Sequence, residues 1–493
     1  MELPNFFTDK NTLLTYNYNN LKQILNTDID NSYRIDNLSI DNKDHNTLCI
    51  NYFKSILLGY NHIFITKLLK DNLNLNSNIS LPLLNDWNGN LSIDNLVVIS
   101  NPNDSERICK SHVKKAPIFK NLLKTSIIST TDNDDWKNQR QDMNIAFMPK
   151  LSLSQVFSIS SDRANESHII LKNISNNFSE EVNISDFFLN ETQSQLQLAM
   201  FGFSNEFEKK TNKKLREAFS GINTDYIEVF CKESIKEMSK SVGPLSQVIQ
   251  ESSKDLEQLI GNIIIFSFAG HDTTGHTLTW LIYELCKNPK YKQKLIQEID
   301  NYWNNNTEAT YDTLDQLPFM TKCITETLRL WPALANGTYR ELEKDEYITG
   351  HDGEKVELKQ GTYCQIINWT RHRNPDLWGD DVNEFNPDRI FKDEEIWDYK
   401  GFGTTHISSE RFSPFTYGPR HCIGKNFSQM EMRLILLNIF KYYDFELTDE
   451  QKKTIHDPNY LGINTFTMGP SNINKNNELL GMYVHIIPRY SKL

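Results

Sequence analysis

The chain has 493 residues and a formal net charge of −12, and 38% of its residues are hydrophobic. This length suits one large domain or two to three ordinary ones, and an aromatic share of 11% is enough to furnish a sizeable core. The negative balance provides no global basic field, so overall charge excludes recruitment of the protein to nucleic acid.

The spacing of the cysteines indicates a reducing compartment. The start of the chain lacks the basic segment and apolar run of a secretory signal. No window reaches the roughly 18 apolar residues that span a bilayer. We therefore expect no transmembrane anchor and a protein that is cytoplasmic or peripherally membrane-associated, not secreted. The cysteines form no CxxC pair and stand at positions 49, 109, 231, 286, 323, 364 and 422.

The beginning of the chain is largely polar and gives few clear signals. Residues 52–69 fit either an amphipathic helix or a short helix ending at Gly59 and followed by a strand. The polar residues 70–90 are interpreted as an insertion. Residues 95–100 predict a strand, and residues 104–110 predict the start of a helix.

Helical periodicity dominates the rest of the chain. Residues 132–135 supply N-cap candidates and first-turn acids for a helix. Short strands are expected near residues 347–368 and 480–488. The predicted fold class is therefore mainly α with small β-sheets. The long helices expected after the first one cover residues 185–202, 255–286, 289–303 and 319–330.

A glycine-bracketed loop near the C-terminus is the most informative segment. It has the pattern Phe415-x-x-Gly418-x-Arg420-x-Cys422-x-Gly424 and runs directly into a strongly helical stretch. Cys422 is thus expected just before a helix N-terminus, where free amide groups and the helix dipole favour thiolate over thiol. The glycines allow a tight backbone whose N–H groups approach the sulfur, as they do around metal-bound thiolates.

This loop resembles the haem-binding loop of the cytochrome P-450 family. The resemblance implies haem b (iron protoporphyrin IX) as the cofactor and Cys422 as its metal ligand. It also implies that Phe415, Arg420 and Gly424 contribute to cofactor binding. The other matches below follow the chain order of that family.

A long apolar stretch over residues 263–285 carries unusual residues at its middle. Glycine and β-branched threonine are poor helix formers, and Thr273 can hydrogen-bond back to the preceding turn and open a polar notch. The stretch resembles the oxygen-binding helix of the family. The resemblance places Ala269 and Gly270 at the cofactor and implies that Asp272 and Thr273 deliver protons in catalysis.

Three further residues resemble the network behind the haem in this family. Glu326 and Arg329 are three residues apart, so a helix places them on one face. Arg389 belongs to a Pro-Asp-Arg element that resembles the family's Pro-Glu-Arg element, with Asp replacing Glu. The resemblance gives these residues a structural role.

Several cationic or donor side chains match positions that bind the haem propionates. Trp136 and Arg140 lie four residues apart, which aligns them on one helical stripe. Arg340 and Arg420 match two further propionate-binding positions. Positive charge is needed at such a site, because burying two unpaired carboxylates is expensive.

Together these matches imply one large cytochrome P-450-type haem domain over residues 91–493. Residues 1–90 match poorly and are expected to be a polar N-terminal region of that domain. The implied function is a haem-thiolate monooxygenase that uses dioxygen to hydroxylate or epoxidise an apolar organic substrate. Electrons would come from a separate NAD(P)H-dependent redox partner, either a flavoprotein or a ferredoxin.

Two alternatives remain open. Residues 202–270 supply less helical material than the family's pocket lid requires, which motivates a non-catalytic haem-binding sensor. A peroxide-dependent oxygenase or an isomerase on the same fold is a second alternative, although the Asp–Thr pair argues against it. Lys137, Lys425 and Arg433 are expected to form a basic surface for an acidic redox partner.

Overall fold

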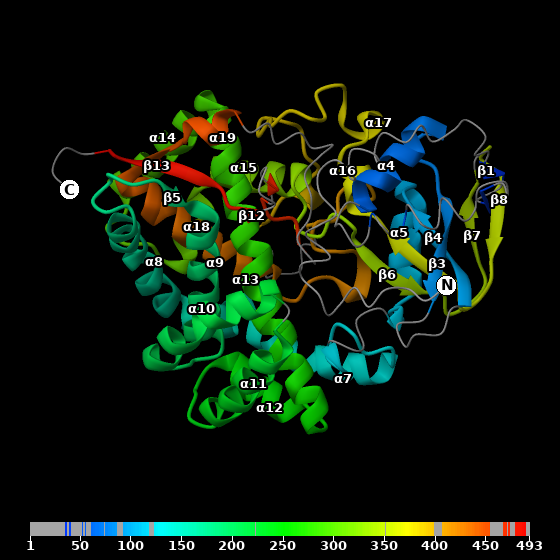
Figure 1. The fold of residues 1–493 in the computed structure, drawn as a ribbon, viewed down its shortest axis with the longest axis horizontal. Coiled ribbons are helices and arrows are strands. Elements are labelled where there is room, and N and C mark those ends of the chain that lie inside the picture. Colours follow the sequence, from blue (N-terminus) through cyan, green and yellow to red (C-terminus); the bar gives the residue numbers. More distant parts are fainter. Residues whose placement is uncertain are drawn as a thin grey trace. The chain divides into compact units, whose positions relative to one another are not determined.

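The structure is a computed structural model. It describes residues 35–36, 39–40, 52, 55, 61–72, 74–85, 92–117, 123–221, 223–350, 352–398, 407–453, 467–470, 472–473 and 479–489. The chain divides into two compact units (Figure 1). The sheet unit comprises residues 1–116, 334–382 and 456–481, and the helical unit comprises residues 117–333, 383–455 and 482–493.

The core of the sheet unit is a four-stranded sheet in the order β3-β4-β9-β6. β4 and β9 are parallel, whereas the two outer pairs are antiparallel. The run Val97-Val98-Ile99 in β4 is buried, as expected for a central strand. The longer elements of this unit are α4 (Asn61–Asn72), β3 (Ile79–Asn85), β4 (Ser92–Ile99), α5 (Pro102–Ser111), β6 (Thr338–Glu341), β7 (Glu346–Thr349), β8 (Lys355–Leu358), β9 (Tyr363–Ile366), α16 (Asn368–His372) and α17 (Pro375–Trp378).

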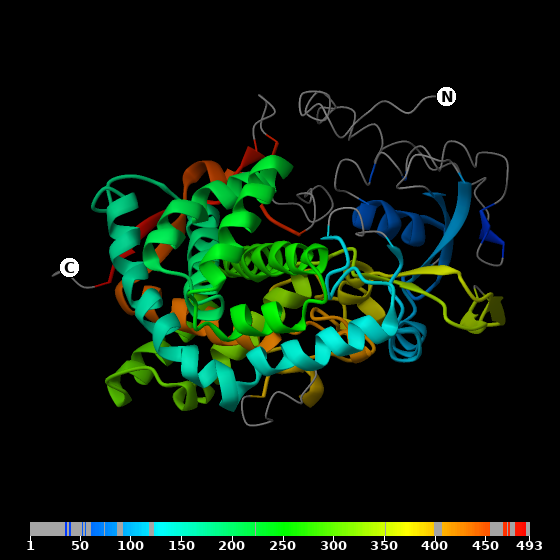
Figure 2. The same ribbon diagram turned by 90° about the horizontal axis from the view of Figure 1, so that it is seen from below.

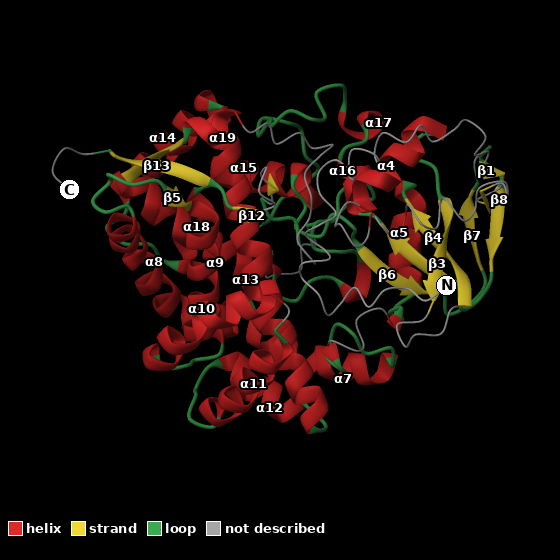
Figure 3. Ribbon diagram, in the orientation of Figure 1, coloured by secondary structure: helices red, strands yellow, loops and turns green. Residues whose placement is uncertain are grey.

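β7 and β8 form an antiparallel hairpin, and the remaining strands of this unit are two short antiparallel pairs. Figure 3 shows the strands of the sheet unit in yellow. The short pairs are β1 (Ile35–Asp36) with β2 (Ser39–Ile40) and β11 (Asn472–Ile473) with β12 (Leu479–Leu480).

Two expectations for the beginning of the chain are wrong. Residues 61–72 are helical, so no strand follows Gly59, and the supposed polar insertion over residues 70–90 contains β3. β3 forms because Ile79 and Leu81 alternate into the core, where both are fully buried. Pro82 is tolerated within it because β3 lies at the edge of the sheet. The predicted strand near 95–100 and the helix near 104–110 are confirmed as β4 and α5.

The helical unit is built around α13, a helix of 32 residues from Leu256 to Lys287. Its neighbours include α9, α11, α12, α14, α15 and α18 (Figure 2). Gly270 and Gly275 allow close packing of α13. A Cβ at Gly270 would lie under 3.0 Å from a methyl group of Leu196, and a Cβ at Gly275 would lie under 3.0 Å from a methyl group of Leu189. None of the helices among the described residues is both long enough and apolar enough to cross a bilayer.

The bounds of the other elements of the helical unit follow. Its helices are α7 (Asn133–Asn144), η3 (Ile145–Phe147), η4 (Pro149–Leu153), α8 (Ser154–Ile174), α9 (Ile184–Gln195), η5 (Leu196–Met200), α10 (Asn205–Gly221), α11 (Thr224–Met238), α12 (Pro244–Ser252), α14 (Pro289–Asn305), η6 (Tyr311–Gln316), α15 (Pro318–Leu330), η7 (Asp393–Glu395), η8 (Gly418–Arg420), α18 (Lys425–Tyr442) and α19 (Asp449–Lys453). Its sheet is antiparallel, in the order β10-β13-β5, with β5 (Val182–Asn183), β10 (Tyr443–Leu447) and β13 (Tyr483–Pro488).

Local signals explain where the long helices begin. The Asp132 carboxylate accepts hydrogen bonds from the N–H groups of Asp134 and Asp135, and Asp255 caps α13 in the same way. Pro289 and Pro318 occupy the first positions of α14 and α15, where the missing N–H has no cost. The mainly α fold class is therefore confirmed, together with these starts.

The expected shortage of helix between Gly202 and Gly270 is wrong. The structure places α10, α11 and α12 there, with 17, 15 and 9 residues. The polar surface of α10 and α11 hides their amphipathic periodicity, since both helices bury narrow stripes that include Leu215 and Phe230. The structure therefore gives this region more helix than the sequence predicts.

Candidate functional site

The cysteine loop, residues 415–424, folds back on itself just before α18. The N–H of Cys422 donates to the carbonyl of Phe415 at 2.7 Å, and the N–H of His421 donates to the carbonyl of Gly418 at 3.1 Å. Thr416 and Gly418 both have a positive φ, 67° and 66°. The glycine adopts this conformation without strain and allows the tight turn.

Cys422 is exposed, whereas the other cysteines among the described residues are buried or half-buried. Protein surrounding the thiol nevertheless raises its pKa, and the N–H of Gly424, Arg140 and Lys425 act in the opposite direction. The accessible surface matters for ligation, since a metal must reach the sulfur.

α7 brings two donors to the cysteine loop. Arg140 Nη1 donates to the carbonyl of His421 at 2.8 Å, and Nη2 lies 2.9 Å from His421 Nε2. The Trp136 indole instead stacks against Arg420, whose Cζ lies 4.3 Å from the indole centroid. Burial lowers the pKa of Arg140 to about 10, and the Cys422 thiol acts against this shift.

The middle of α13 differs from its flanks. Ala269, Gly270 and Thr273 are half-buried, whereas the residues from Thr274 to Leu285 are buried. The Thr273 hydroxyl donates to the carbonyl of Ala269 at 2.9 Å, as the sequence predicts. Asp272 Oδ2 lies 3.8 Å from His276 Nδ1, so the acid has a titratable neighbour one turn later.

The structure brings Glu326, Arg329 and Arg389 together in the interior. Arg329 Nε and Nη2 donate to the two oxygens of Glu326 at 2.7 and 2.8 Å, and both side chains are fully buried. Arg389 Nε lies 3.4 Å from Glu326 Oε1, which also accepts the N–H of Asn386 at 3.0 Å. The Glu326 carboxylate thus holds α15 and the segment around residue 389 together.

Arg340 belongs to the sheet unit, in β6. Its side chain is fully buried, and Nη1 donates to Thr338 Oγ1 and to the carbonyl of Tyr339. Nε and Nη2 have no hydrogen-bond partner among the described residues. A buried guanidinium with two unsatisfied nitrogens is suited to an anion, because leaving such groups unpaired is costly.

The basic surface expected from three residues does not exist. Lys425 and Arg433 are buried, with exposures of 3% and 0%, and only Lys137 is exposed. Arg433 donates to Gln429 and Thr321 and stacks on Trp397. Their positions on α18 point toward the protein interior, which a charge count along the sequence does not reveal.

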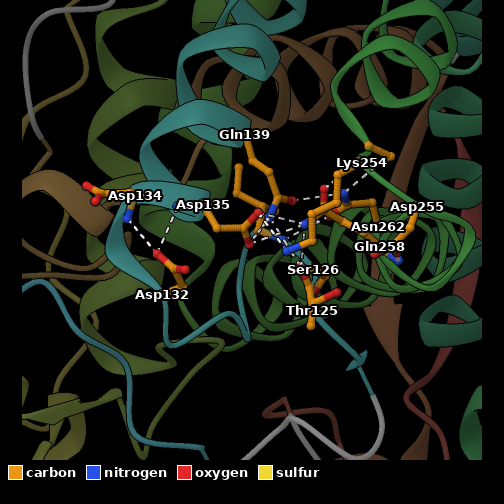
Figure 4. Close-up of polar contacts among 12 residues, drawn as sticks. Thr125, Ser126, Asp132, Asp134, Asp135, Gln139, Lys254, Asp255, Gln258 and Asn262 are labelled. Carbon is orange, nitrogen blue, oxygen red and sulfur yellow. Dashed lines mark hydrogen bonds and ion pairs between the residues drawn. The ribbon is translucent and has the colours of Figure 1, made fainter.

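A polar cluster between α7, α13 and the segment before α7 has no counterpart in the sequence analysis. Figure 4 shows it, with Asp135 and Gln139 from α7 facing Gln258 and Asn262 from α13. Gln258 and Asn262 interrupt the apolar periodicity of α13 near its start. That interruption is the signal that identifies them.

Comparison with known proteins extends these observations. A family model described as Cytochrome P-450 matches residues 238–474, a range that includes α13, α15 and the cysteine loop. Trp136 and Arg140 lie outside that range.

Among relatives, a Caenorhabditis elegans protein named cytochrome P-450 CYP13A4 is 31% identical over 265 residues, which are 51% of this chain and 48% of the relative. Dog cytochrome P-450 3A12 is 36% identical over 192 residues, which are 39% of this chain and 35% of the relative. The match therefore spans about half the length of the first relative or less. A further C. elegans relative, CYP13A7, is 34% identical over 217 residues, covering 44% of this chain and 38% of the relative. The range that the family model matches contains the cysteine loop and the middle of α13, so this part of the chain is similar to the cytochrome P-450 family.

Proposed function

We propose that the protein is a haem-thiolate monooxygenase that inserts one oxygen atom from dioxygen into an apolar organic substrate by hydroxylation or epoxidation. The observation that carries this proposal is the exposed Cys422 in a tight loop ahead of α18. Bound to a cysteine thiolate, haem iron supplies the oxygen-activating chemistry, because the thiolate donates electron density that favours O–O cleavage. The haem domain would extend over residues 91–493, with residues 1–90 as its polar N-terminal region.

The residues present fit haem b. Cys422 would hold the iron, with Phe415 and Gly424 shaping the loop around it. In the sheet unit, Arg340 has two unsatisfied nitrogens, which suit an anion, and its role as a propionate ligand rests on the resemblance of the sequence alone. Arg140 and Arg420 would add further positive charge, and Trp136 would hold the guanidinium of Arg420 in place.

α13 would supply protons to the reaction. Converting dioxygen to water and an inserted oxygen atom consumes two electrons and two protons. We assign proton delivery to the Thr273 hydroxyl, with the Asp272 carboxyl recharging it. The half-buried position of Ala269, Gly270 and Thr273 leaves this part of the helix accessible to small molecules.

The aromatic surroundings of α13 support an apolar substrate. Phe219 and Phe268 are half-buried and form a T-shaped pair with ring centroids 5.3 Å apart. Such rings favour an apolar substrate. We propose that electrons come from a separate NAD(P)H-dependent flavoprotein or ferredoxin. Lys425 and Arg433 are buried and do not form its docking surface.

Two measurements, made one after the other, test the proposed function. The first is a thiolate-type carbon monoxide spectrum of the reduced, haem-loaded protein. The second is a screen for spectral changes with fatty acids, sterols and terpenoids, followed by turnover with a redox partner. Turnover driven by peroxide alone would instead support the peroxide-dependent alternative, and rearrangement without reductant would support an isomerase.

Thr273→Ala should uncouple reductant consumption from product formation. We expect product per NAD(P)H to fall about tenfold or more and peroxide to rise, since a positioned proton-transfer group contributes about 10²–10⁴-fold. Thr273→Ser is the matched control, because it retains the hydroxyl that donates to Ala269. Product and peroxide are measured with a substrate from the screen. Equal coupling in Thr273→Ala and the wild type would remove Thr273 from proton delivery.

Arg140→Ala should weaken haem retention. The variant removes the guanidinium that donates to the carbonyl of His421, next to the proposed iron ligand. We expect faster loss of haem during dialysis against a haem-binding competitor, followed by absorbance. Lys137→Ala is the matched control, because Lys137 is exposed on the same helix and pairs only at the surface with Asp134. Identical retention in the two variants would contradict a role for Arg140 at the haem.

A further inference from the structure

Residues 123–130, here called the strap, lie between three elements of the helical unit. Gln139 on α7 and Gln258 on α13 both donate to the carbonyl of Thr125, each at 3.2 Å. α13 approaches the strap closely, because a Cβ at Gly261 would lie 2.5 Å from the carbonyl oxygen of Leu123. The strap is therefore fastened to both helices, as Figure 4 shows for Thr125.

Ile127 joins α13 to the cysteine loop through its own backbone. Its N–H donates to Asn262 Oδ1 at 2.9 Å. Its carbonyl accepts Arg420 Nη1 at 3.2 Å, and Arg420 Nη2 donates to the carbonyl of Thr130 at 3.2 Å. Ile127 thus donates one hydrogen bond to α13 and accepts one from the loop that contains Cys422.

Asn262 lies at one end of this series of hydrogen bonds and is itself held in place. It is fully buried, and its Nδ2 donates to Gln139 Oε1 at 3.0 Å. Its acceptor and donor atoms therefore bind two different elements at once. An apolar residue would suit this position on α13 better for packing alone, since burial of an amide is costly unless its hydrogen bonds are made.

The surrounding charges reinforce the same arrangement. Gln258 Nε2 donates to Asp135 Oδ1 at 3.0 Å, and Lys254 Nζ lies 3.2 Å from the same oxygen. Burial acts to raise the pKa of Asp135, but hydrogen bonds from Gln258, Thr130 and Lys254 lower it below its usual value. These contacts of Asp135 thereby hold α7 and the start of α13 together beside the strap.

We propose that Asn262 is a positioning residue for the cysteine loop, holding Ile127 so that the Ile127 carbonyl fixes the guanidinium of Arg420. The consequence for haem rests on the proposed function, in which Arg420 binds a propionate. The consequence for the cysteine loop does not rest on the proposed function, because every hydrogen bond that links Asn262 to Arg420 is made within the polypeptide.

The test uses the full chain with Asn262→Leu, which is similar in size and makes no hydrogen bonds. In haem-free protein, we expect amide hydrogen exchange of residues 415–424 to become about tenfold faster, equivalent to ~1.4 kcal/mol. In haem-loaded protein, we expect haem transfer to an excess of haem-free globin to accelerate by a similar factor. Adding Asn262→Leu to Arg420→Ala should produce little further acceleration of loop exchange, because Arg420→Ala already removes the contact through which Asn262 acts.

Two further variants separate positioning from general destabilisation. Thr279→Val is the matched control, because Thr279 is also fully buried on α13 and its hydroxyl bonds only within the helix, to the carbonyl of Gly275. Asn262→Asp keeps an acceptor for Ile127 but loses the donor to Gln139. It should speed exchange in α7 and leave the cysteine loop slow.

Unchanged loop exchange in Asn262→Leu would overturn the proposal, as would equal acceleration in Thr279→Val. If Asn262→Leu does not fold, fast loop exchange in Asn262→Asp would overturn it. Failure of the wild-type protein to bind haem would overturn the proposed function instead, while the exchange measurements in haem-free protein would still decide the role of Asn262.

Discussion

Cys422→Ser should abolish the thiolate-type carbon monoxide spectrum and, with it, monooxygenase turnover. A serine hydroxyl is far less acidic than a thiol and donates less electron density to iron, so O–O cleavage loses its driving contribution. The measurement is the difference spectrum of the reduced protein with and without carbon monoxide, alongside haem content. We expect residual haem in the pocket to show the spectrum of a different axial ligand.

Cys286→Ser is the matched control for this substitution. Cys286 is half-buried and its thiol donates to the carbonyl of Phe445, a contact that a serine hydroxyl can replace. We expect its spectrum and turnover to match those of the wild type. A Cys422→Ser protein with the wild-type spectrum would contradict the proposed iron ligand and with it the haem-thiolate function.

Glu326→Ala should have the largest effect on stability. Glu326 is fully buried and neutralises Arg329, also fully buried, while contacting Arg389 at 3.4 Å. Removing one partner of a buried ion pair leaves an uncompensated charge and costs about 3–5 kcal/mol. For a chain of 493 residues, this corresponds to a fall of about 3–5 °C in the thermal midpoint, followed by circular dichroism.

An exposed ion pair provides the comparison for Glu326. Glu228 and Lys232 form an i,i+4 pair on α11 at 2.6 Å, and both side chains are more than half exposed. Glu228→Ala should leave the thermal midpoint unchanged, because solvent already screens the pair. If Glu326→Ala and Glu228→Ala shifted the midpoint equally, burial would not explain the contribution of the Glu326 network.

Features with a strong local cause could be predicted from the sequence. Asp132 and Asp255 cap α7 and α13 because their side chains satisfy free N–H groups within three residues. α18 begins directly after the glycine loop, with Gly424 as its N-cap residue. Such interactions are visible along the chain because both partners are close in sequence.

Features that depend on tertiary packing could not be predicted. β3 was hidden because its partner strand, β4, and the core it faces decide which of its residues are inside. Lys425 and Arg433 look like surface cations in sequence, yet α18 is buried over most of its length. The partners of Arg433, Thr321 and Trp397, lie on segments distant from it in the chain.

The candidate site shows the same division. The spacing of Glu326 and Arg329 places them on one helical face, but the distance of Arg389 from Glu326 depends on a segment some 60 residues later. The fully buried Asn262 and its bond to Ile127 bridge 135 residues of sequence and leave only an interrupted apolar pattern as a trace. Resemblance to a family identified the first group, and only the folded chain revealed the second.

The position of the cysteine loop in the chain has a consequence for biosynthesis. α8 packs against α18, although about 250 residues separate the end of the first helix from the start of the second. A ribosome therefore releases α8 and α13 long before α18, and the apolar faces they share with α18 remain uncovered in the nascent chain. Cys422 enters its place only when α18 docks, so we expect cofactor capture to follow the synthesis of α18 and its packing against α8 and α13.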